Sequence, residues 1–325
     1  MKTVFIPPIL DWSFLKQLPQ QIASQFARNG YRVIFCNNTR GEYDKIEEVE
    51  ENLFVYHNKD KVIEDLKYKR IKADIFYNTF AKNLDWANAV NAKTTIYHSC
   101  DVFRDWANYE VPMIKRADVV LCTSQYIYDI RKEQHENVHL VRNACASELI
   151  DLSPTFPDDL VDIEVPRFLF AGAVGEWVST YLIKKIAEKH STVLVGKEFG
   201  KKISSNVINL GVKPHSELIN YYSYSDVGLI PFRTKTEITQ AANPIKVWEY
   251  LACGLPVLAT SWAEMELPEF KDIVFTADTD EEFISLADKL SNLTEDERRV
   301  ISEKAIAVAK NNTWEKRFEY IKNIL

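Results

Sequence analysis

The feature that most constrains the fold is a regular alternation of short apolar runs with amphipathic stretches, which occurs in both halves of the chain. The apolar runs are rich in β-branched and aromatic residues and lack strict polar alternation, which is typical of parallel strands covered on both faces. This pattern predicts doubly wound α/β domains that bind ligands at the carboxyl ends of their strands. The expected strands cover residues 3–6, 31–36, 53–56, 74–77, 94–97, 119–123, 138–141, 167–171, 192–195, 207–210, 227–231, 256–259 and 273–276. The expected helices cover residues 19–29, 61–71, 126–133, 178–189, 215–224, 244–253, 281–290 and 295–310.

The alternation stops in one stretch, residues 151–166, which is rich in proline and acidic residues. Because such residues interrupt regular structure, we expect a domain boundary there. With 325 residues the chain is long enough for two domains that each bury a core. We expect an N-terminal Rossmann-like domain at 1–155, a C-terminal Rossmann-like domain at 166–312 and a final amphipathic helix at 313–325.

Composition and charge exclude several classes of function. The net charge of −7 argues against nucleic acid as a partner, since binding to a phosphate backbone needs a basic surface. The longest stretch without a charge, residues 250–263, is interrupted by Gly254 and Pro256, so it does not predict a membrane-spanning helix. The first apolar run ends at Pro7, too early for a signal peptide. The five cysteines are scattered and form no C-x-x-C pair, which indicates reduced thiols and a cytoplasmic protein.

One segment of the N-terminal half is locally basic. Acidic residues are interleaved with its lysines, so the simplest interpretation is a solvated helix face. The alternative is peripheral contact with anionic lipid headgroups at the inner face of the membrane. The basic residues are Lys59, Lys61, Lys67, Lys69, Arg70 and Lys72, and the interleaved acids are Asp60, Glu64 and Asp65.

Residues 243–260 carry the strongest functional signal, the string Asn-Pro-x-Lys-x-x-Glu-Tyr-x-Ala-x-Gly-x-Pro-Val. Pro244 suits the first turn of a helix, and Gly254 suits a left-handed cap after its end. The free N–H groups of the helix start face the loop at Asn243, and Lys246 adds a full charge, so a phosphate-like anion fits there. Glu249, at i+3 from Lys246, is placed to accept hydrogen bonds from hydroxyls. Together these residues indicate a nucleoside diphosphate with its ribose, and an ordinary surface ion pair is the simpler alternative.

The string resembles the donor-nucleotide motif of the GT-B glycosyltransferases, in particular the "group 1" type that includes bacterial teichuronic-acid and exopolysaccharide enzymes. The resemblance implies the GT-B fold and a metal-independent hexosyltransferase without a cofactor, acting in bacterial surface polysaccharide synthesis. It further implies a UDP- or GDP-linked sugar donor, a saccharide or lipid-linked saccharide acceptor, and a final helix that crosses back to the N-terminal domain. In such an enzyme Lys246 would stabilise the charge that grows on the diphosphate as the sugar leaves.

Other positions in the C-terminal half fit the same resemblance. The segment 210–218 resembles the loop that receives the nucleobase, where Val212 would supply backbone contacts. Gly172 and Gly175 follow an expected strand, and a turn without side chains there lets the backbone approach a diphosphate. Arg233 follows another expected strand and would add a cation for the leaving group. For each position an ordinary turn or a solvated loop charge is the alternative.

In the N-terminal half, His98 and Asp101 follow an expected strand, so either could orient or deprotonate an acceptor hydroxyl. A helix cap is the alternative for Asp101. The resemblance also places an acceptor-side loop at Asp11 and Trp12.

One departure from the resembled pattern concerns stereochemistry. Retaining members often carry two glutamates eight residues apart, whereas Ala241 stands eight positions before Glu249. The choice between a retaining and an inverting route is therefore open, and an inverting route would need a base such as Asp101. Two other functions also remain open: a nucleotide-sugar 2-epimerase of the same fold, and a noncatalytic nucleotide-sugar-binding subunit.

Overall fold

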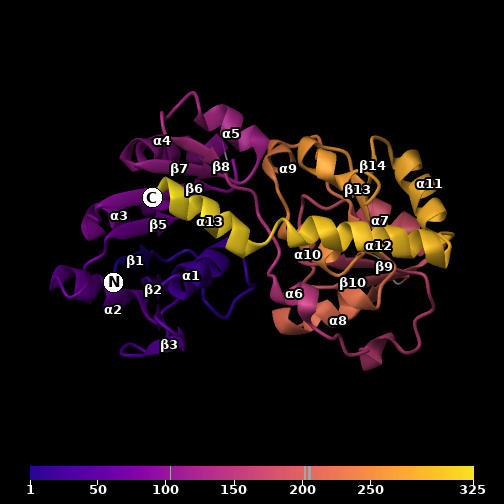
Figure 1. Ribbon diagram of the computed structural model, residues 1–325, viewed down its shortest axis with the longest axis horizontal. Helices are drawn as coiled ribbons and strands as arrows, with labels where there is room; N and C mark the ends of the chain where they lie inside the picture. The colour runs from indigo at the N-terminus through magenta and orange to yellow at the C-terminus, as the bar shows by residue number, and fades with distance from the viewer. Residues whose placement is uncertain (103, 201–202, 204–205) are drawn as a thin grey trace. The chain divides into compact units, whose positions relative to one another are not determined.

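The computed structural model describes residues 1–102, 104–200, 203 and 206–325. The chain forms two compact units, each with its own sheet (Figure 1). Unit 1 comprises Met1–Arg142, Ala241–Asn243 and Arg317–Leu325, and unit 2 comprises Asn143–Gln240 and Pro244–Lys316. Two α/β units of this kind confirm the predicted fold class.

Unit 1 contains an eight-stranded sheet of order β3-β4-β2-β1-β5-β6-β7-β8. Every neighbouring pair is parallel except β3 and β4, which pair antiparallel at one edge. The strands are β1 (Thr3–Ile6), β2 (Arg32–Cys36), β3 (Ile46–Glu50), β4 (Leu53–Tyr56), β5 (Ile75–Asn78), β6 (Thr94–Ser99), β7 (Val119–Cys122) and β8 (Val138–Leu140).

The helices of unit 1 connect these parallel strands. The last helix of the chain, α13, also reaches this unit: Phe318 packs edge to face on Phe26, with ring centroids 4.8 Å apart, and the Arg317 Nε donates to the Arg142 carbonyl at 3.1 Å. The helices are α1 (Leu18–Arg28), α2 (Lys59–Lys67), α3 (Leu84–Val90), α4 (Ala107–Arg116), α5 (Gln125–Arg131) and α13 (Trp314–Ile324).

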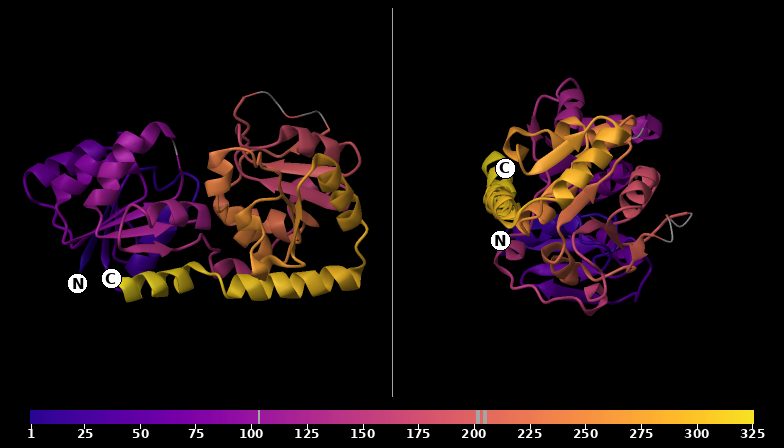
Figure 2. Two further views of the ribbon diagram at one scale, coloured as in Figure 1. Left: turned by 90° about the horizontal axis from the view of Figure 1, so that it is seen from above. Right: turned by 90° about the vertical axis from the view of Figure 1, so that its right-hand side faces the viewer.

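Unit 2 contains a six-stranded, fully parallel sheet of order β11-β10-β9-β12-β13-β14. The strands are β9 (Arg167–Ala171), β10 (Ser191–Val195), β11 (Ile208–Asn209), β12 (Val227–Ile230), β13 (Val257–Thr260) and β14 (Val274–Ala277). The helix α12 packs against α10. In Figure 2, α12 is the longest of the helices at the yellow end of the colour scale. The helices are α6 (Glu148–Asp151), α7 (Thr180–Ala187), α8 (Leu218–Ser223), α9 (Glu237–Ala241), α10 (Ile245–Ala252), α11 (Asp280–Ser291) and α12 (Glu295–Lys310). Short 3-10 helices occur in both units. They are η1 (Ala81–Asn83) and η2 (Arg104–Trp106) in unit 1, and η3 (Asp158–Leu160), η4 (His215–Glu217), η5 (Ala263–Met265) and η6 (Pro268–Phe270) in unit 2.

The division between the units lies earlier in the chain than the expected boundary at 151–166. Cys145 already belongs to unit 2, because its main chain bonds to Asn312 at 3.2 Å and to Trp314 at 3.0 Å. Leu160 and Ile163 are buried in the core of unit 2. The proline-rich stretch is therefore part of unit 2 and not a free linker, because its apolar side chains pack into the core of that unit.

Across the part of the chain that the structure describes, no helix combines the length and the apolar character needed to cross a membrane.

Candidate functional site

The helix α10 is bounded by the residues that the sequence indicated. Pro244 is its N-cap residue, with φ −69° and ψ 130°. Gly254 has φ +75° after the helix end, a left-handed conformation that favours glycine. A side chain at this glycine would also collide with Ser302. The helix is therefore held to eight residues, which carry both Lys246 and Glu249.

Tyr250 fixes α10 against strand β9. Its buried hydroxyl accepts a hydrogen bond from the Ala171 N–H at 2.9 Å and donates to the Leu169 carbonyl at 3.3 Å. Gly228, in the middle of β12, leaves the space that the tyrosine ring occupies. Buried hydrogen bonds of this kind order an element in a single position. They hold the start of α10 beside the turn that follows β9.

Lys246 lies in the first helical turn of α10, and its side chain faces the loop that follows β9. Its ammonium nitrogen lies 4.0 Å from the centre of the Phe170 ring and 5.5 Å from that of Phe232. Gly172 has φ +129°, and a Cβ there would lie 2.8 Å from the same nitrogen. No carboxylate of the described residues lies within ion-pair distance of Lys246. Burial lowers the pKa of Lys246 from 10.5 to about 7, and the nearby charge of Glu249 partly opposes this effect.

The Lys246 ammonium contacts aromatic rings but no carboxylate, so it can still bind an anionic ligand. Interactions of an ammonium with aromatic rings give about 0.5–2 kcal/mol, much less than its hydration supplies, so the desolvated charge is only partly compensated. The first N–H groups of α10 also lack intrahelical partners. These features together make the start of α10 a candidate anion site.

Glu249 lies one turn further along α10 and is buried, with 6% of its surface exposed. One carboxylate oxygen is 2.8 Å from the His215 Nε2, and the other accepts a hydrogen bond from the Tyr222 hydroxyl at 2.9 Å. Each carboxylate oxygen keeps a further lone pair for a ligand hydroxyl. His215 begins η4, directly after the loop that contains Val212. The carboxylate is therefore oriented by two groups before any ligand binds.

The remaining expected residues of unit 2 lie around the turn after β9 and the two neighbouring loops. Gly175 packs under the Trp177 ring, which would collide with any side chain at that position. The Arg233 side chain is exposed, and its Nε donates to the Val178 carbonyl at 3.3 Å. Val212 is 62% exposed in the loop after β11, so its backbone is accessible. Their contacts with a nucleotide remain predictions.

Sequence reasoning missed three residues that shape this site: Phe170, Tyr222 and His215. The two aromatic residues lie in apolar stretches that look like ordinary core. His215 lies within the segment 210–218, but nothing in that segment pairs it with Glu249. For Tyr250 a signal existed, because a glycine inside a strand, as at Gly228, marks a close approach of another group.

Five expected positions belong to unit 1, among them Asn243, which is buried in the segment Ala241–Asn243 that groups with this unit. Asp101 follows β6 with an exposed side chain, and no hydrogen bond from the described residues reaches its carboxylate. Partial removal from water raises the pKa of Asp101, and the negative charge of Glu110 adds to the increase. A raised pKa suits a general base.

The structure argues against an acceptor-side role for His98. The strand β6 continues to Ser99, so His98 lies inside the sheet and is fully buried. The Tyr77 hydroxyl is 2.7 Å from its Nδ1, and its Nε2 is 3.1 Å from the Val141 carbonyl. Because a carbonyl only accepts, Nε2 carries the proton and the tyrosine donates to Nδ1. Burial lowers the pKa of His98 to about 4, which keeps this structural histidine neutral.

Asp11 and Trp12 tie two loops of unit 1 together. One Asp11 oxygen accepts from the Asn38 N–H at 2.8 Å and from the Thr39 N–H at 3.0 Å. The Trp12 N–H donates to the side chain of Asn37 at 2.8 Å. Both residues therefore have structural partners, and their contact with an acceptor remains a prediction.

Among the described residues, no group of three or more histidine, cysteine, aspartate or glutamate side chains is arranged to hold a metal ion. The metal independence expected from the sequence stays a prediction.

Comparison with known proteins agrees with this geometry. Residues 179–323 match the family model described as glycosyl transferase-like, which confirms the resemblance seen in the sequence. The putative teichuronic acid biosynthesis glycosyltransferase TuaH of Bacillus subtilis is 27% identical over 232 residues, which cover 65% of this chain and 57% of the relative. The chain thus spans little more than half the length of this relative.

Solved structures show the fold. Sucrose-phosphate synthase from Thermosynechococcus elongatus has a TM-score of 0.72 at 14% identity, covering 100% of this chain and 98% of that chain. Anabaena Alr3699/HepE, in complex with UDP and glucose, has a TM-score of 0.72 at 13% identity, covering 100% of both chains. The likeness establishes that the two sheets are those of a GT-B fold.

Proposed function

We propose that this chain, whose residues 179–323 match the glycosyl transferase-like family, is a glycosyltransferase acting in bacterial surface polysaccharide synthesis. Its donor is a UDP- or GDP-linked sugar, and its acceptor is a saccharide or lipid-linked saccharide. The observation that carries the proposal is the Lys246 ammonium, which faces Phe170 and Gly172 at the start of α10 without an acidic partner. The relative TuaH and the UDP-bound HepE support the same chemistry.

In the proposed reaction, cleavage of the bond between sugar and phosphate leaves negative charge on the diphosphate. Lys246 and the N–H groups at the start of α10 stabilise this charge. Arg233 supplies a further cation from the loop after β12. Because Tyr250 fixes α10 in advance, the N–H groups at the start of this helix need no rearrangement when the charge develops.

The ribose is proposed to bind the Glu249 carboxylate, which His215 and Tyr222 hold in position. The nucleobase then lies against the backbone of the loop at Val212. The hexosyl unit passes to an acceptor hydroxyl, and Asp101 acts as its base if the reaction inverts configuration.

The test of the function is incubation of the purified chain with radiolabelled UDP- and GDP-hexoses and a mixture of lipid-linked saccharide acceptors. We expect label in the acceptor and release of the nucleoside diphosphate. Isomerised sugar formed from the donor alone would instead identify a 2-epimerase. Nucleotide binding without turnover on any acceptor would identify a binding subunit.

Transfer is expected to be unaffected by excess EDTA, because Lys246 and the helix start take the role that a divalent cation has in other transferases. The initial rate is measured after dialysis against EDTA, and again with added magnesium or manganese. A rate that EDTA abolishes and either metal restores would contradict this prediction.

His215→Ala is expected to raise the Kd of UDP or GDP about tenfold while turnover at saturating donor is retained, since hydrogen bonds to charged groups are worth about 1.5–3 kcal/mol. Glu249→Ala should weaken binding at least as much, and both losses should be smaller for a 2′-deoxy nucleotide. The matched control is His190→Ala, which removes another histidine–carboxylate pair of unit 2, with Asp288 at 2.9 Å. Unchanged nucleotide affinity in both His215→Ala and Glu249→Ala would place the ribose elsewhere.

We also propose that the protein acts in the cytoplasm, peripherally at the inner face of the membrane, where lipid-linked saccharides are presented. The basic segment around α2 supports this location.

A further inference from the structure

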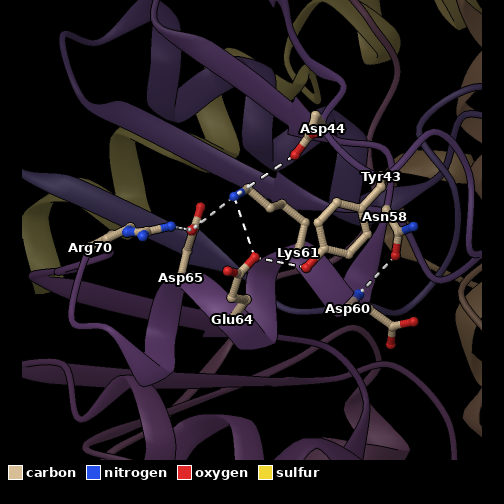
Figure 3. Close-up of polar contacts among 8 residues, drawn as sticks. All are labelled: Tyr43, Asp44, Asn58, Asp60, Lys61, Glu64, Asp65 and Arg70. Carbon is tan, nitrogen blue, oxygen red and sulfur yellow. Dashed lines mark hydrogen bonds and ion pairs between the residues drawn. The ribbon is translucent and has the colours of Figure 1, made fainter.

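The basic segment at α2 divides into two groups, and Figure 3 shows the neutralised one. The Lys61 ammonium lies 3.3 Å from Asp65, 3.5 Å from Glu64 and 4.0 Å from Asp44. Arg70 pairs with the same Asp65 at 3.0 Å. These two cations are therefore occupied by acids of their own unit, as the interpretation of a solvated helix face predicted.

The other four basic residues have no acidic partner within ion-pair distance among the described residues. They are Lys59, Lys67, Lys69 and Lys72, and all but Lys59 are exposed. Lys59 and Lys67 share one face of α2 with Ile63, because residues four apart lie one above the other on a helix. The unpaired charges thus border apolar side chains.

The apolar side chains form a groove between α2 and α3 with a volume of ≈ 510 Å³. Ile63 is 50% exposed there, and Tyr68, just after α2, is 58% exposed. Asp85 is the one acid in its lining. The groove is lined by Ile63, Leu66, Lys67, Asp85, Trp86 and Ala89.

Lys69 stands where the backbone favours glycine. It has φ +53°, and its N–H donates to the Leu66 carbonyl at 2.9 Å while the Arg70 N–H donates to the Asp65 carbonyl at 2.8 Å. These two bonds form a C-terminal helix cap, in which the residue with the left-handed conformation is usually glycine or asparagine. A lysine there strains the backbone, which points to a use for its side chain outside the helix.

We propose that this surface, the α2–α3 face, binds an anionic lipid bilayer. Lys67, Lys69 and Lys72 contact phosphate headgroups, while Ile63 and Trp86 lie at the boundary between headgroups and acyl chains. Clustered lysines beside exposed apolar residues are typical of proteins that lie on anionic membranes. Since the chain has a net charge of −7, this attraction is local and orients the protein. The inference rests on the peripheral location proposed above and names the surface responsible.

The experiment is co-sedimentation of the full chain with vesicles of phosphatidylcholine alone, or with about 30% phosphatidylglycerol as in a strongly anionic membrane. We expect binding only to the anionic vesicles and its loss in high salt. The triple variant Lys67→Glu, Lys69→Glu and Lys72→Glu should bind at least tenfold more weakly, because each lysine near the surface contributes about fivefold. The matched control carries the same charge change at Lys271, Lys310 and Lys322, which have no acidic partner within ion-pair distance among the described residues, and should bind like the unmodified protein.

Lys69→Gly separates a lipid contact from a structural role. Glycine relieves the left-handed backbone, so Tm should rise or stay constant, while binding to anionic vesicles should weaken. A lower Tm together with unchanged vesicle binding would overturn the assignment of Lys69.

Three results would overturn the proposal as a whole: equal binding to neutral and anionic vesicles, unchanged binding of the triple variant, or an equal loss in the control. Binding to polyglutamate but not to vesicles would indicate an acidic protein partner instead. Nucleotide binding and transfer to a soluble acceptor are measured without vesicles, and the triple variant should retain both. Vesicle binding without any transfer would contradict the proposed function and leave the lipid surface in place.

Discussion

Lys246→Met is expected to lower turnover with the donor about a hundredfold to a thousandfold, the loss typical of removing one group that stabilises a developing anion. The same substitution is expected to raise the melting temperature of the ligand-free protein. Methionine fills a similar space against Phe170 and Phe232 and removes a poorly hydrated charge, so a gain of about 1–2 kcal/mol in the free energy of unfolding is expected.

The pH dependence of this gain follows from the pKa of Lys246, which is about 7 in the folded protein and 10.5 ordinarily. Between these values the unfolded chain holds the proton and the folded protein does not, so the free energy of unfolding of the unmodified protein rises with pH across this window. The advantage of Lys246→Met should therefore be largest below pH 7 and should shrink as the pH approaches 10. Affinity for the nucleoside diphosphate should fall above pH 7 in the unmodified protein, because binding then requires uptake of a proton.

Calorimetry at pH 6 and pH 9.5 measures the stability effect, and titration with UDP and GDP on either side of pH 7 measures the affinity. The control is Lys184→Met, which removes an exposed lysine on α7 of the same unit. If Lys246→Met lowered Tm as an ordinary core mutation does, or left turnover intact, Lys246 would not be the diphosphate cation.

Asp101→Asn is expected to lower turnover about a hundredfold while the Kd of the nucleoside diphosphate is unchanged, as typical for loss of a general base. Asparagine keeps the shape and cannot take the proton. The raised pKa of Asp101 further predicts that activity is lost on acidification at a higher pH than for an ordinary aspartate, since the protonated acid is inactive. Asp105→Asn, a nearby exposed aspartate, is the control.

Stability and steady-state kinetics of the Asp101 variant are measured together. Full turnover with a lowered Tm would assign Asp101 to a cap of the following segment. Full turnover with an unchanged Tm would favour a retaining route, in which leaving-group stabilisation dominates and no acceptor-side base is needed.

The fold was predictable where burial decides the local structure. The parallel strands appear close to their expected positions, because continuous β-branched runs suit a strand covered on both faces. The edge strand β3 was missed, since three of its five residues are glutamates and none of them is buried. Helix α4 was missed because Pro112 lies in its interior, where proline usually ends a helix.

The candidate site was predictable only where its residues are neighbours in sequence. Lys246 and Glu249 share one helix turn, so their spacing alone indicated a common ligand. Phe170, which faces the same ammonium, lies on β9 and is brought there by tertiary packing. His98 was expected in a loop because the apolar pattern predicted a strand that ends at residue 97. The strand β6 continues to Ser99, so His98 lies in the core.

The attachment of α10 to β9 through Tyr250 separates two tasks that a transferase must combine. The proposed phosphate site lies on a helix that is hydrogen-bonded to the sheet, whereas Val212 and His215 lie in the loop after β11 and at the start of η4, where His215 contacts Glu249. We expect that exchange of that loop would alter which nucleobase binds, while Lys246 and the start of α10 would keep their positions. We therefore expect substitutions confined to that loop to change donor preference while the rate of transfer is retained.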